Sequence, residues 1–459
     1  MAFLDRLFRK KQELNSDTPI NERRALELIG EGNLLEDRGE PKKALALYDA
    51  AVGLAPGLAR GHLNRGNALA AIENFKSAVE AFSKALEINP HYAGAHFNLG
   101  NAYMRLGMLE LAREAYTHAL KVLPDYTDAE VALGAVLEDL RQFESACAHY
   151  RRALELQPNY VQVHCNLGNS LKKLNRFDEA LISYRRAIEL DPNYVDAHNN
   201  IATVLQDLGR LEESKSSYLR ALELRPDSID TQGNLLFVMN YGGPDPHCSA
   251  LLHARRYGEL VARKARPYTR WNVSAQPERC LRVGFVSGDF REHPVGFFLE
   301  NALGALVSRS DGQLQCVAYS NHAFEDATTQ RLRSNFQLWR SCVGLSDAAL
   351  AKQIYDDAVD ILIDLSGHTA GNRLPVFAFK AAPVQISWLG YFGTTGVQAM
   401  DYLLADPWTL PVSDECNFTE KIWRLPETRL CFTPPALNIG VSKLPALDNG
   451  YVTFGCFNN

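Results

Sequence analysis

Residues 93–126 read AGAHFNLGNAYMRLGMLELAREAYTHALKVLPDY, and this stretch decides the fold of the first half of the chain. Its order of small residues, an aromatic residue and a closing proline returns every 34 residues. A period of that length is typical of two short helices joined by a turn and repeated in tandem. The prolines that close the units are Pro56, Pro90, Pro124, Pro158, Pro192 and Pro226.

Four further columns keep the same spacing, and each residue type suits one task in a helix pair. Small residues let two helices approach closely, an aromatic side chain fills the space beside them, and proline ends the second helix. The first helix carries Gly32, Gly66, Gly100, Gly134, Gly168 and Ala202. The second helix carries Ala44, Ala78, Ala112, Ala146, Ala180 and Ser214, then Tyr48, Phe82, Tyr116, Tyr150, Tyr184 and Tyr218, then Ala51, Ala85, Ala119, Ala153, Ala187 and Ala221.

This pattern is that of tetratricopeptide repeats, which stack into an α superhelix with a concave surface for peptides or partner proteins. It predicts six repeats from about residue 25 to residue 228, with one further first helix near residues 229–239. The predicted array therefore covers residues 25–240 and follows an N-terminal extension of residues 1–24.

An asparagine column runs through the first helices, interrupted by Ala132. Its members are Asn64, Asn98, Asn166, Asn200 and Asn234. An asparagine amide offers both donors and an acceptor, so such a column can bind the backbone of an extended peptide. A solvated helix face explains the column equally well, and the spacing leaves both interpretations open. A second column, formed by Asn67, Asn101 and Asn169, is predicted to pack or cap between repeats.

Charge and composition exclude several classes of partner. The 459 residues have a formal net charge of -6, so no broad basic surface is expected and nucleic acid is a poor candidate ligand. No run approaches eighteen apolar residues, and charges interrupt residues 1–11, so neither a membrane span nor a signal peptide is predicted. Nine scattered cysteines form no C-x-x-C pair and no zinc spacing, which indicates reduced thiols in a cytoplasmic protein.

The repeat pattern ends at a loop over residues 240–247, which a helix over 249–264 and an irregular segment over 265–280 follow; we assign residues 241–280 to a linker. The remaining residues, 281–459, alternate apolar runs with helical stretches, which predicts a doubly wound α/β domain. The predicted strands are 281–290, 315–320, 359–367, 383–390, 401–406 and 451–457. The predicted helices are 297–308, 328–338, 346–357 and 374–380.

Polar or glycine-rich loops follow three of these strands, where a doubly wound sheet binds its ligands. The loops run from Ser287 to Pro294, from Ser366 to Thr369 and from Gly390 to Gly396. Glycine allows positive φ and lets backbone N–H groups approach a sugar or a phosphate. His293 and His368 lie in two of the loops, and each is either a proton acceptor for a sugar hydroxyl or a structural histidine bonded to a carbonyl. Asp289 either accepts a hydrogen bond from a neighbouring loop or caps the turn.

Several motifs are missing. There is no G-x-G-x-x-G dinucleotide fingerprint, no phosphate-binding G-x-x-x-x-G-K-[ST] and no G-x-S-x-G nucleophile elbow. The Asp-x-Asp motif that metal-dependent glycosyltransferases commonly use is absent too. A glycosyltransferase built on this sequence is therefore expected to need no metal and no cofactor.

Two stretches carry a family resemblance. LRVGFVSGDFREHPVGFFLENAL, residues 281–303, and DILIDLSGHTAGNRLPVFAFKAAPVQISWLGYFGTTGVQAMDYLLAD, residues 360–406, resemble the amino-terminal catalytic lobe of the bacterial O-GlcNAc transferase or SPINDLY-like family. The upstream repeats match that family's domain order. The resemblance implies a GT-B fold whose two Rossmann-like lobes bind UDP-GlcNAc between them. It also implies inverting transfer of GlcNAc to a Ser or Thr hydroxyl of a protein held by the repeats.

The resemblance assigns roles to residues of the three loops. His293 matches the proposed general base, and His368 lies in a motif on the acceptor and sugar side. Phe392 stands where the family usually has proline, which changes the shape of the loop that approaches GlcNAc. The expected substrate- and sugar-binding residues are Asp289, Pro294, Gly367, Thr369, Gly390, Tyr391, Gly393, Thr394 and Thr395.

Residues 457–459 resemble the entry into the second lobe, which binds uridine and diphosphate in that family. We therefore expect only the first lobe here, in a fragment with little or no activity alone, whose nucleotide sugar binds together with the missing lobe. Two alternatives stay open: a related protein O-fucosyl- or glucosyltransferase, and a non-catalytic repeat scaffold. The oligomeric state is open as well, a homo-oligomer included.

Overall fold

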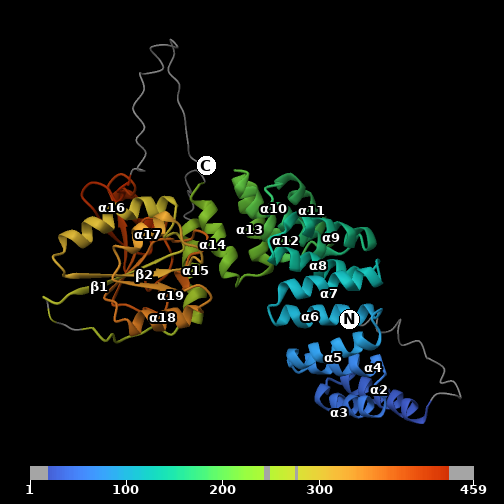
Figure 1. The fold of residues 1–459 in the computed structure, drawn as a ribbon. Helices are drawn as coiled ribbons and strands as arrows, with labels where there is room; N and C mark the ends of the chain where they lie inside the picture. The colour runs from blue at the N-terminus through green and yellow to red at the C-terminus, as the bar shows by residue number, and fades with distance from the viewer. Residues whose placement is uncertain (1–18, 242–248, 274–275, 277, 434–459) are drawn as a thin grey trace, which may run out of the picture. The chain divides into compact units, whose positions relative to one another are not determined.

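A computed structural model describes residues 19–241, 249–273, 276 and 278–433, and Figure 1 shows its secondary structure. The chain divides into two compact units, one ending at Pro226 and the other beginning at Asp227. The predicted strand over residues 451–457 and most of the predicted N-terminal extension lie outside the described residues.

The described part of the first unit consists of helix pairs, which confirms the predicted repeat fold. The helices are α2 (Ile20–Asp37), α3 (Pro41–Leu54), α4 (Ala59–Ala71), α5 (Phe75–Ile88), α6 (Ala93–Arg105), α7 (Leu109–Val122), α8 (Thr127–Asp139), α9 (Phe143–Leu156), α10 (Val161–Lys173), α11 (Phe177–Leu190), α12 (Val195–Asp207) and α13 (Leu211–Leu224). Each repeat proline lies just beyond the end of a second helix, at the position where its ring would block further helical turns.

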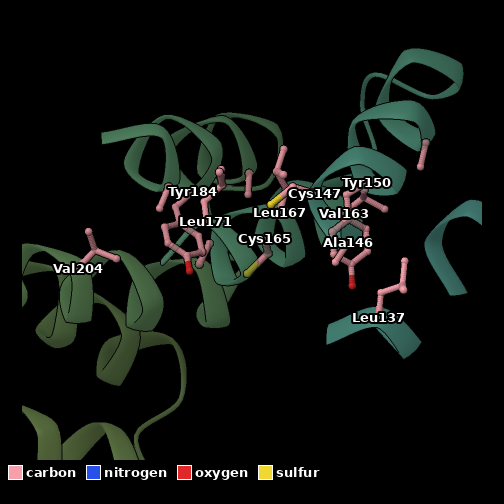
Figure 2. Packing of buried hydrophobic residues seen from close by; sticks show 14 of the residues in the cluster. Leu137, Ala146, Cys147, Tyr150, Val163, Cys165, Leu167, Leu171, Tyr184 and Val204 are labelled. Atoms are coloured by element: carbon pink, nitrogen blue, oxygen red, sulfur yellow. The ribbon is translucent and has the colours of Figure 1, made fainter. Parts of the chain in front are cut away.

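Close packing between glycine and an aromatic ring joins the two helices of each repeat. A Cβ atom added to Gly134 in α8 would lie 2.5 Å from Cε1 of Tyr150 in α9, so only glycine leaves room for that ring. Tyr150 is fully buried, and Figure 2 shows it with Tyr184 among the apolar side chains of neighbouring repeats. The glycine column of the sequence is therefore a packing requirement.

The tyrosine hydroxyls find partners inside the array, as buried polar groups must. Tyr116 donates to Oδ1 of Asn101, and Tyr184 donates to Oδ1 of Asn169, each at 2.7 Å. Asn67, where the repeat has a phenylalanine, instead accepts a hydrogen bond from Asn98 at 2.8 Å. Asn67 and Asn169 thus accept hydrogen bonds from the following repeat, as predicted for the second asparagine column, whereas the bond to Asn101 lies within its own repeat.

The sixth repeat replaces the usual glycine by Ala202. Tyr218 of the same helix pair has longer hydroxyl hydrogen bonds, 3.2 Å to Thr203 and 3.4 Å to Gln206. The hydroxyl of Ser214, which replaces the repeat alanine, donates to the Ala202 carbonyl at 2.7 Å. The two replacements therefore lie together in the same helix pair.

The second unit begins with two helices, α14 (Ile229–Met239) and α15 (Ser249–Lys264). The sequence attached the segment of α14 to the repeat array, whereas in the structure this helix groups with the second unit. Leu236 of α14 packs with Tyr257 of α15 in the hydrophobic core that also contains Val286 of the sheet. The helix over residues 249–264 has the predicted bounds.

Seven parallel strands form the sheet of the second unit, in the order β3-β2-β1-β4-β5-β6-β7. They are β1 (Leu281–Ser287), β2 (Leu314–Ser320), β3 (Leu338–Ser341), β4 (Ile361–Asp364), β5 (Val384–Ser387), β6 (Tyr402–Ala405) and β7 (Lys421–Arg424). The predicted doubly wound α/β lobe is confirmed. The sequence did not predict β3 and β7, because these two short edge strands, LWRS and KIWR, are only partly buried and contain no continuous apolar run.

Helices cover both faces of this sheet (Figure 1). The helices are α16 (Pro294–Arg309), α17 (Ala327–Arg333), α18 (Asp347–Asp356) and α19 (Leu374–Phe377). One core contains Leu299 of α16 with Phe285, and the other contains Ile354 of α18 with Val286, since successive strand residues point to opposite faces. Within the described ranges, no helix is long and apolar enough to cross a membrane.

The order of strands reverses its direction around β1 and β4, which places the loops after these strands next to each other. The amide of Leu365 donates to the Val286 carbonyl at 3.1 Å, and that of Trp388 donates to the Asp364 carbonyl at 2.9 Å. The parallel pairing thus continues to the carboxyl ends of β1, β4 and β5. The three predicted ligand loops leave the sheet side by side at this edge.

We predict that Gly134→Ala loosens its repeat, because the added methyl group collides with the Tyr150 ring. The cost should exceed the gain in helix propensity and leave a net loss of about 1 kcal/mol or more, so amide hydrogen exchange in α8 and α9 should accelerate about fivefold or more. Gly30→Ala is the control, since a Cβ atom there meets no atom within 4 Å. It should leave exchange in α2 unchanged or slower; unchanged exchange in the Gly134 variant would contradict the packing account.

Candidate functional site

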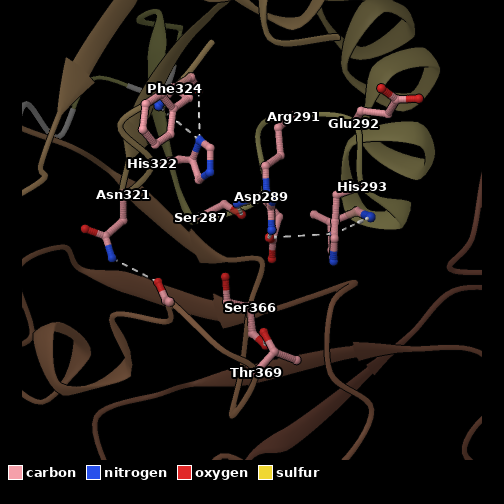
Figure 3. A network of polar contacts seen from close by, with 12 residues as sticks. Ser287, Asp289, Arg291, Glu292, His293, Asn321, His322, Phe324, Ser366 and Thr369 are labelled. Atoms are coloured by element: carbon pink, nitrogen blue, oxygen red, sulfur yellow. Dashed lines mark hydrogen bonds and ion pairs between the residues drawn. The ribbon is translucent and has the colours of Figure 1, made fainter. Parts of the chain in front are cut away.

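The loop after β1 turns back to start helix α16, and His293 is the residue that caps this helix. Its Nδ1 atom accepts a hydrogen bond from the amide of Val295 at 3.3 Å. The preceding turn is held by Ser287, whose hydroxyl accepts from the amide of Asp289 at 2.9 Å. Figure 3 shows Asp289 and His293 beside each other at this turn. The loop therefore places a carboxylate next to an imidazole at a helix N-terminus.

The imidazole of His293 remains partly exposed in this position. Nδ1 lies 3.8 Å from Oδ1 of Asp289, and 35% of the His293 side chain is exposed while Asp289 is buried. Burial lowers the pKa of His293 below its ordinary value, and the Asp289 carboxylate partly opposes this shift. The ring is therefore largely neutral at pH 7, the state that a general base requires.

His368, after β4, has a different environment. It is buried, and its Nε2 atom lies 3.0 Å from the carbonyl oxygen of Thr395, to which it donates. Tyr257 and Tyr391 contact the ring edge-on, with centroid distances of 4.5 and 5.2 Å. Burial lowers its pKa to about 4. The geometry is that of a neutral histidine that joins the β4 and β5 loops, which is the structural alternative named for this residue.

The β5 loop is fixed by a buried carboxylate. Thr394 donates its hydroxyl to Oε2 of Glu420 at 2.7 Å, and the amide of Thr395 donates to Oε1 at 2.7 Å. The Thr395 hydroxyl also donates to Glu420. Both threonine side chains are thus bonded inside the loop, where they hold its shape.

Glycines in these loops permit close backbone approach. Gly367 has φ of 57°, and a Cβ atom there would overlap the Tyr391 side chain. A Cβ atom on Gly390 would overlap the Leu365 carbonyl, and one on Gly393 would lie 2.6 Å from Oδ1 of Asn240. These glycines let the β4 and β5 loops pack together and against α14.

Two pockets open beside the loops. The first, which we call the His293 pocket, has a volume of about 350 Å³. The residues that line it are Phe237, Asn240, Tyr241, His293, Pro294, Val295, Phe298, Thr369, Leu389, Gly390, Tyr391, Phe392, Arg429 and Leu430. The second, the His368 pocket, has about 370 Å³, and its lining includes Asn234, Tyr257, Asp347, His368, Thr369 and Asn372.

The structure thus brings part of the predicted site together. Five of the predicted residues line the His293 pocket: His293, Pro294, Thr369, Gly390 and Tyr391. Five others contribute to the loops without lining either of these two pockets: Asp289, Gly367, Gly393, Thr394 and Thr395. The two predicted catalytic histidines line different pockets, and only Thr369 is common to both.

The predicted peptide-binding column is divided between the units. Asn234 lies on α14 and lines the His368 pocket. Within the array, the amide nitrogens of Asn64, Asn98 and Asn200 donate to Asn33, Asn67 and Asn169 of the preceding repeat, at 2.8 to 2.9 Å. Asn166 is half-buried. Peptide binding by this column stays a prediction.

Sequence patterns missed the contribution of two segments to the His293 pocket. Phe237, Asn240 and Tyr241 come from the end of α14, and the Asn240 amide donates to the Tyr391 hydroxyl at 2.5 Å. Arg429 comes from the irregular segment after β7. The loop signal at residues 240–247 marked the first segment, whereas no motif marks Arg429. Across the part of the chain that the structure describes, no group of three or more His, Cys, Asp or Glu side chains is placed to hold a metal ion.

We predict a pH-dependent stability for the second unit that originates from His368. Since burial lowers its folded pKa to about 4, the unfolded state binds the extra proton between pH 6.5 and 4. The stabilisation is complete above pH 6.5 and is lost as pH falls to about 4, by on the order of 3 kcal/mol. His368→Gln, which keeps a donor for Thr395, should remove this slope.

Urea unfolding followed by tryptophan fluorescence measures this effect, because all five tryptophans lie in the second unit. The wild type should lose stability more steeply than the variant over that pH interval. Equal pH slopes for the two proteins would contradict the buried, neutral assignment.

Comparisons with known proteins agree with this architecture. The family described as Glycosyl transferase family 41 matches residues 253–432, and tetratricopeptide repeat families match segments between residues 66 and 228. The probable UDP-N-acetylglucosamine–peptide N-acetylglucosaminyltransferase SPINDLY of Petunia hybrida is 37% identical over 228 residues, which are 49% of this chain and 24% of that protein. The UDP-N-acetylglucosamine–peptide N-acetylglucosaminyltransferase of Caenorhabditis elegans is 35% identical over 159 residues, 34% of this chain and 13% of that protein.

A solved structure is similar as well. A mutant of the Thermobaculum terrenum O-GlcNAc transferase has 32% sequence identity and a TM-score of 0.60, covering 68% of this chain and 59% of that one. The chain spans about a quarter of the length of the SPINDLY relative. Residues 253–432 are thus a glycosyl transferase family 41 domain, and tetratricopeptide repeats precede it in the same chain.

Proposed function

We propose that this chain contains the repeat array and the amino-terminal catalytic lobe of a protein O-GlcNAc transferase. The proposed reaction is inverting transfer of GlcNAc from UDP-GlcNAc to a Ser or Thr hydroxyl of a protein held by the repeats. The observation that carries the proposal is the pairing of His293 with Asp289 at the wall of a pocket formed by the β1, β4 and β5 loops of a family 41 domain.

In this proposal, whether His293 can act as a base depends on which of its two ring nitrogens carries the proton. While Nδ1 accepts from Val295, the neutral ring carries its proton on Nε2 and acts as a donor. A small rotation that closes the 3.8 Å gap to Asp289 would favour the other neutral tautomer, in which Nε2 has lost its proton to solvent and Nδ1 has gained one from solvent, so that the lone pair of Nε2 is free. Nε2 would then accept the proton of the acceptor hydroxyl while the hydroxyl oxygen attacks the anomeric carbon, and the bond from that carbon to UDP would break as UDP leaves. The Asp289 carboxylate would stabilise the imidazolium that forms.

The other loops position the reactants around this base. Gly390 lines the pocket without a side chain, which brings its backbone close to a bound sugar. Tyr391 and Phe392 stack at 6.2 Å between centroids and supply an aromatic wall. Phe392 is half-exposed, so it can contact the ligand that enters. We propose no metal or cofactor for this step, since a positioned base and a nucleotide leaving group provide its chemistry.

In this proposal the repeats bind the acceptor protein. Asn98 and Asn200 already bond through their amide nitrogens, so in this proposal their carbonyl oxygens accept from the peptide backbone. Backbone recognition of this kind selects extended segments and leaves their side chains free. We therefore propose that the substrates are Ser- or Thr-containing extended regions of proteins.

Donor identity is tested with the protein produced from its complete reading frame. We expect incubation with UDP-GlcNAc, but not with UDP-glucose or GDP-fucose, to add one or more sugar masses to acceptor proteins in intact-mass spectra. Substitution His293→Ala should lower the transfer rate by about a hundredfold or more, as loss of a general base does. Transfer from GDP-fucose or UDP-glucose would show that one of these is the donor in place of UDP-GlcNAc. Absence of transfer from all three would favour a non-catalytic repeat scaffold. Undiminished transfer by the His293 variant would refute the base assignment.

The pH dependence of transfer tests the pairing with Asp289. Because the His293 pKa lies below 6.5, the rate should rise with pH along an acid limb whose midpoint lies below pH 6.5. The Asp289 carboxylate raises this pKa, so Asp289→Asn should move the midpoint to lower pH and should also lower the maximal rate. A pH–rate profile of the variant that keeps both the midpoint and the plateau would contradict the pairing.

A further inference from the structure

Arg429 is a buried cation that the proposed reaction does not use. It is 7% exposed and lines the His293 pocket, among mainly apolar and aromatic side chains. Its backbone is fixed on both sides: its amide donates to Oδ2 of Asp406 at 2.9 Å, and its carbonyl accepts from Nε1 of Trp388 at 3.0 Å. These anchors follow β6 and β5, so the sheet determines where the arginine side chain starts.

No hydrogen bond or ion pair to another described residue satisfies the Arg429 guanidinium, and its Nε atom is fully buried. The nearest candidate counter-charge is Asp406, but its carboxylate already accepts from the backbone amides of Trp408, Thr409 and Arg429 at 2.7 to 3.0 Å. None of the residues that line the pocket is an aspartate or a glutamate. Arg429 is the one permanently charged side chain in that lining.

An unpaired cation in such a pocket destabilises the folded protein unless a bound ligand supplies the opposite charge. Removing a guanidinium from water without a partner carries a penalty, and burial accordingly lowers the pKa of Arg429. The same low-dielectric surroundings strengthen its attraction to an anion. The N-terminus of the 16-residue helix α16, at His293 and Pro294, faces the same pocket and adds partial positive charge.

We propose that the His293 pocket selects a ligand bearing a carboxylate or phosphate group, which Arg429 binds as a charge-assisted pair. This proposal rests on the proposed function and defines its substrate class. The anion can belong to the acceptor, as an acidic or phosphorylated residue beside the hydroxyl-bearing one, which fits transfer of GlcNAc. An anion on the sugar, as in a uronic acid, would instead replace GlcNAc as the transferred sugar. The chemistry of recognition is the same in both cases.

Binding of matched probes to the full chain tests the proposal by isothermal titration. One pair is methyl glucuronide against methyl glucoside, and the other is the blocked dipeptide Ser-Glu against Ser-Gln. We expect the anionic member of at least one pair to bind about tenfold more tightly than its neutral partner, with the difference shrinking as salt is raised. The pair that shows the preference identifies the source of the anion.

Variants assign the preference to Arg429. Arg429→Gln should abolish it, Arg429→Lys should retain part of it, and Arg270→Gln, at an exposed arginine of the second unit, should leave it unchanged. Equal binding of charged and neutral probes by the wild type would overturn the proposal without reference to any variant, as would a preference that survives Arg429→Gln. Sugar transfer that proceeds without any anion preference would overturn this inference alone. An anion preference in a protein that transfers no sugar would instead count against the proposed function.

Discussion

The parallel hydrogen-bond register that joins β4 to β1 and to β5 is the interaction on which the rest of the candidate site depends. It carries the Val286 and Asp364 carbonyls into bonds with residues just beyond the strands, so the three loops emerge at one edge. Three kinds of contact then hold the loops together. Glycines leave room for the neighbouring backbone, Glu420 accepts hydrogen bonds from the β5 loop, and His368 of the β4 loop donates to Thr395. His293 needs none of these bonds itself, which leaves its ring available to a ligand.

The two histidines at this sheet edge differ in burial and in their neighbours. His368 is enclosed by Tyr257 and Tyr391 and is held neutral, whereas His293 keeps an exposed edge and an acidic neighbour. A base must remain able to receive a proton in the working pH range. The environment of His293 permits that, and the environment of His368 opposes it. His368 therefore joins the loops beside the pocket, and His293 is the residue for which we propose the role of base.

Sequence patterns predicted most of the fold, because the features that they detect are packing requirements. A column of glycines appears every 34 residues since each faces a buried ring, as Gly134 faces Tyr150. Strands buried on both faces give apolar runs, so β1, β2, β4, β5 and β6 were found, whereas the amphipathic edge strands β3 and β7 were not. Residue types after strands pointed to His293 and Thr369. The anchoring of Arg429 by Asp406 and Trp388 joins segments that are distant in sequence, and no local pattern encodes it.

The central claim, that His293 acts as a base with Asp289 as its partner, is tested most directly by the tautomer of the His293 ring. Nitrogen-15 NMR of the imidazole, recorded with an acceptor peptide and UDP-GlcNAc bound to the protein produced from its complete reading frame, measures which nitrogen carries the proton. The account predicts a neutral ring protonated at Nδ1, toward Asp289, with Nε2 unprotonated. A ring that remains protonated at Nε2 in that complex would contradict it.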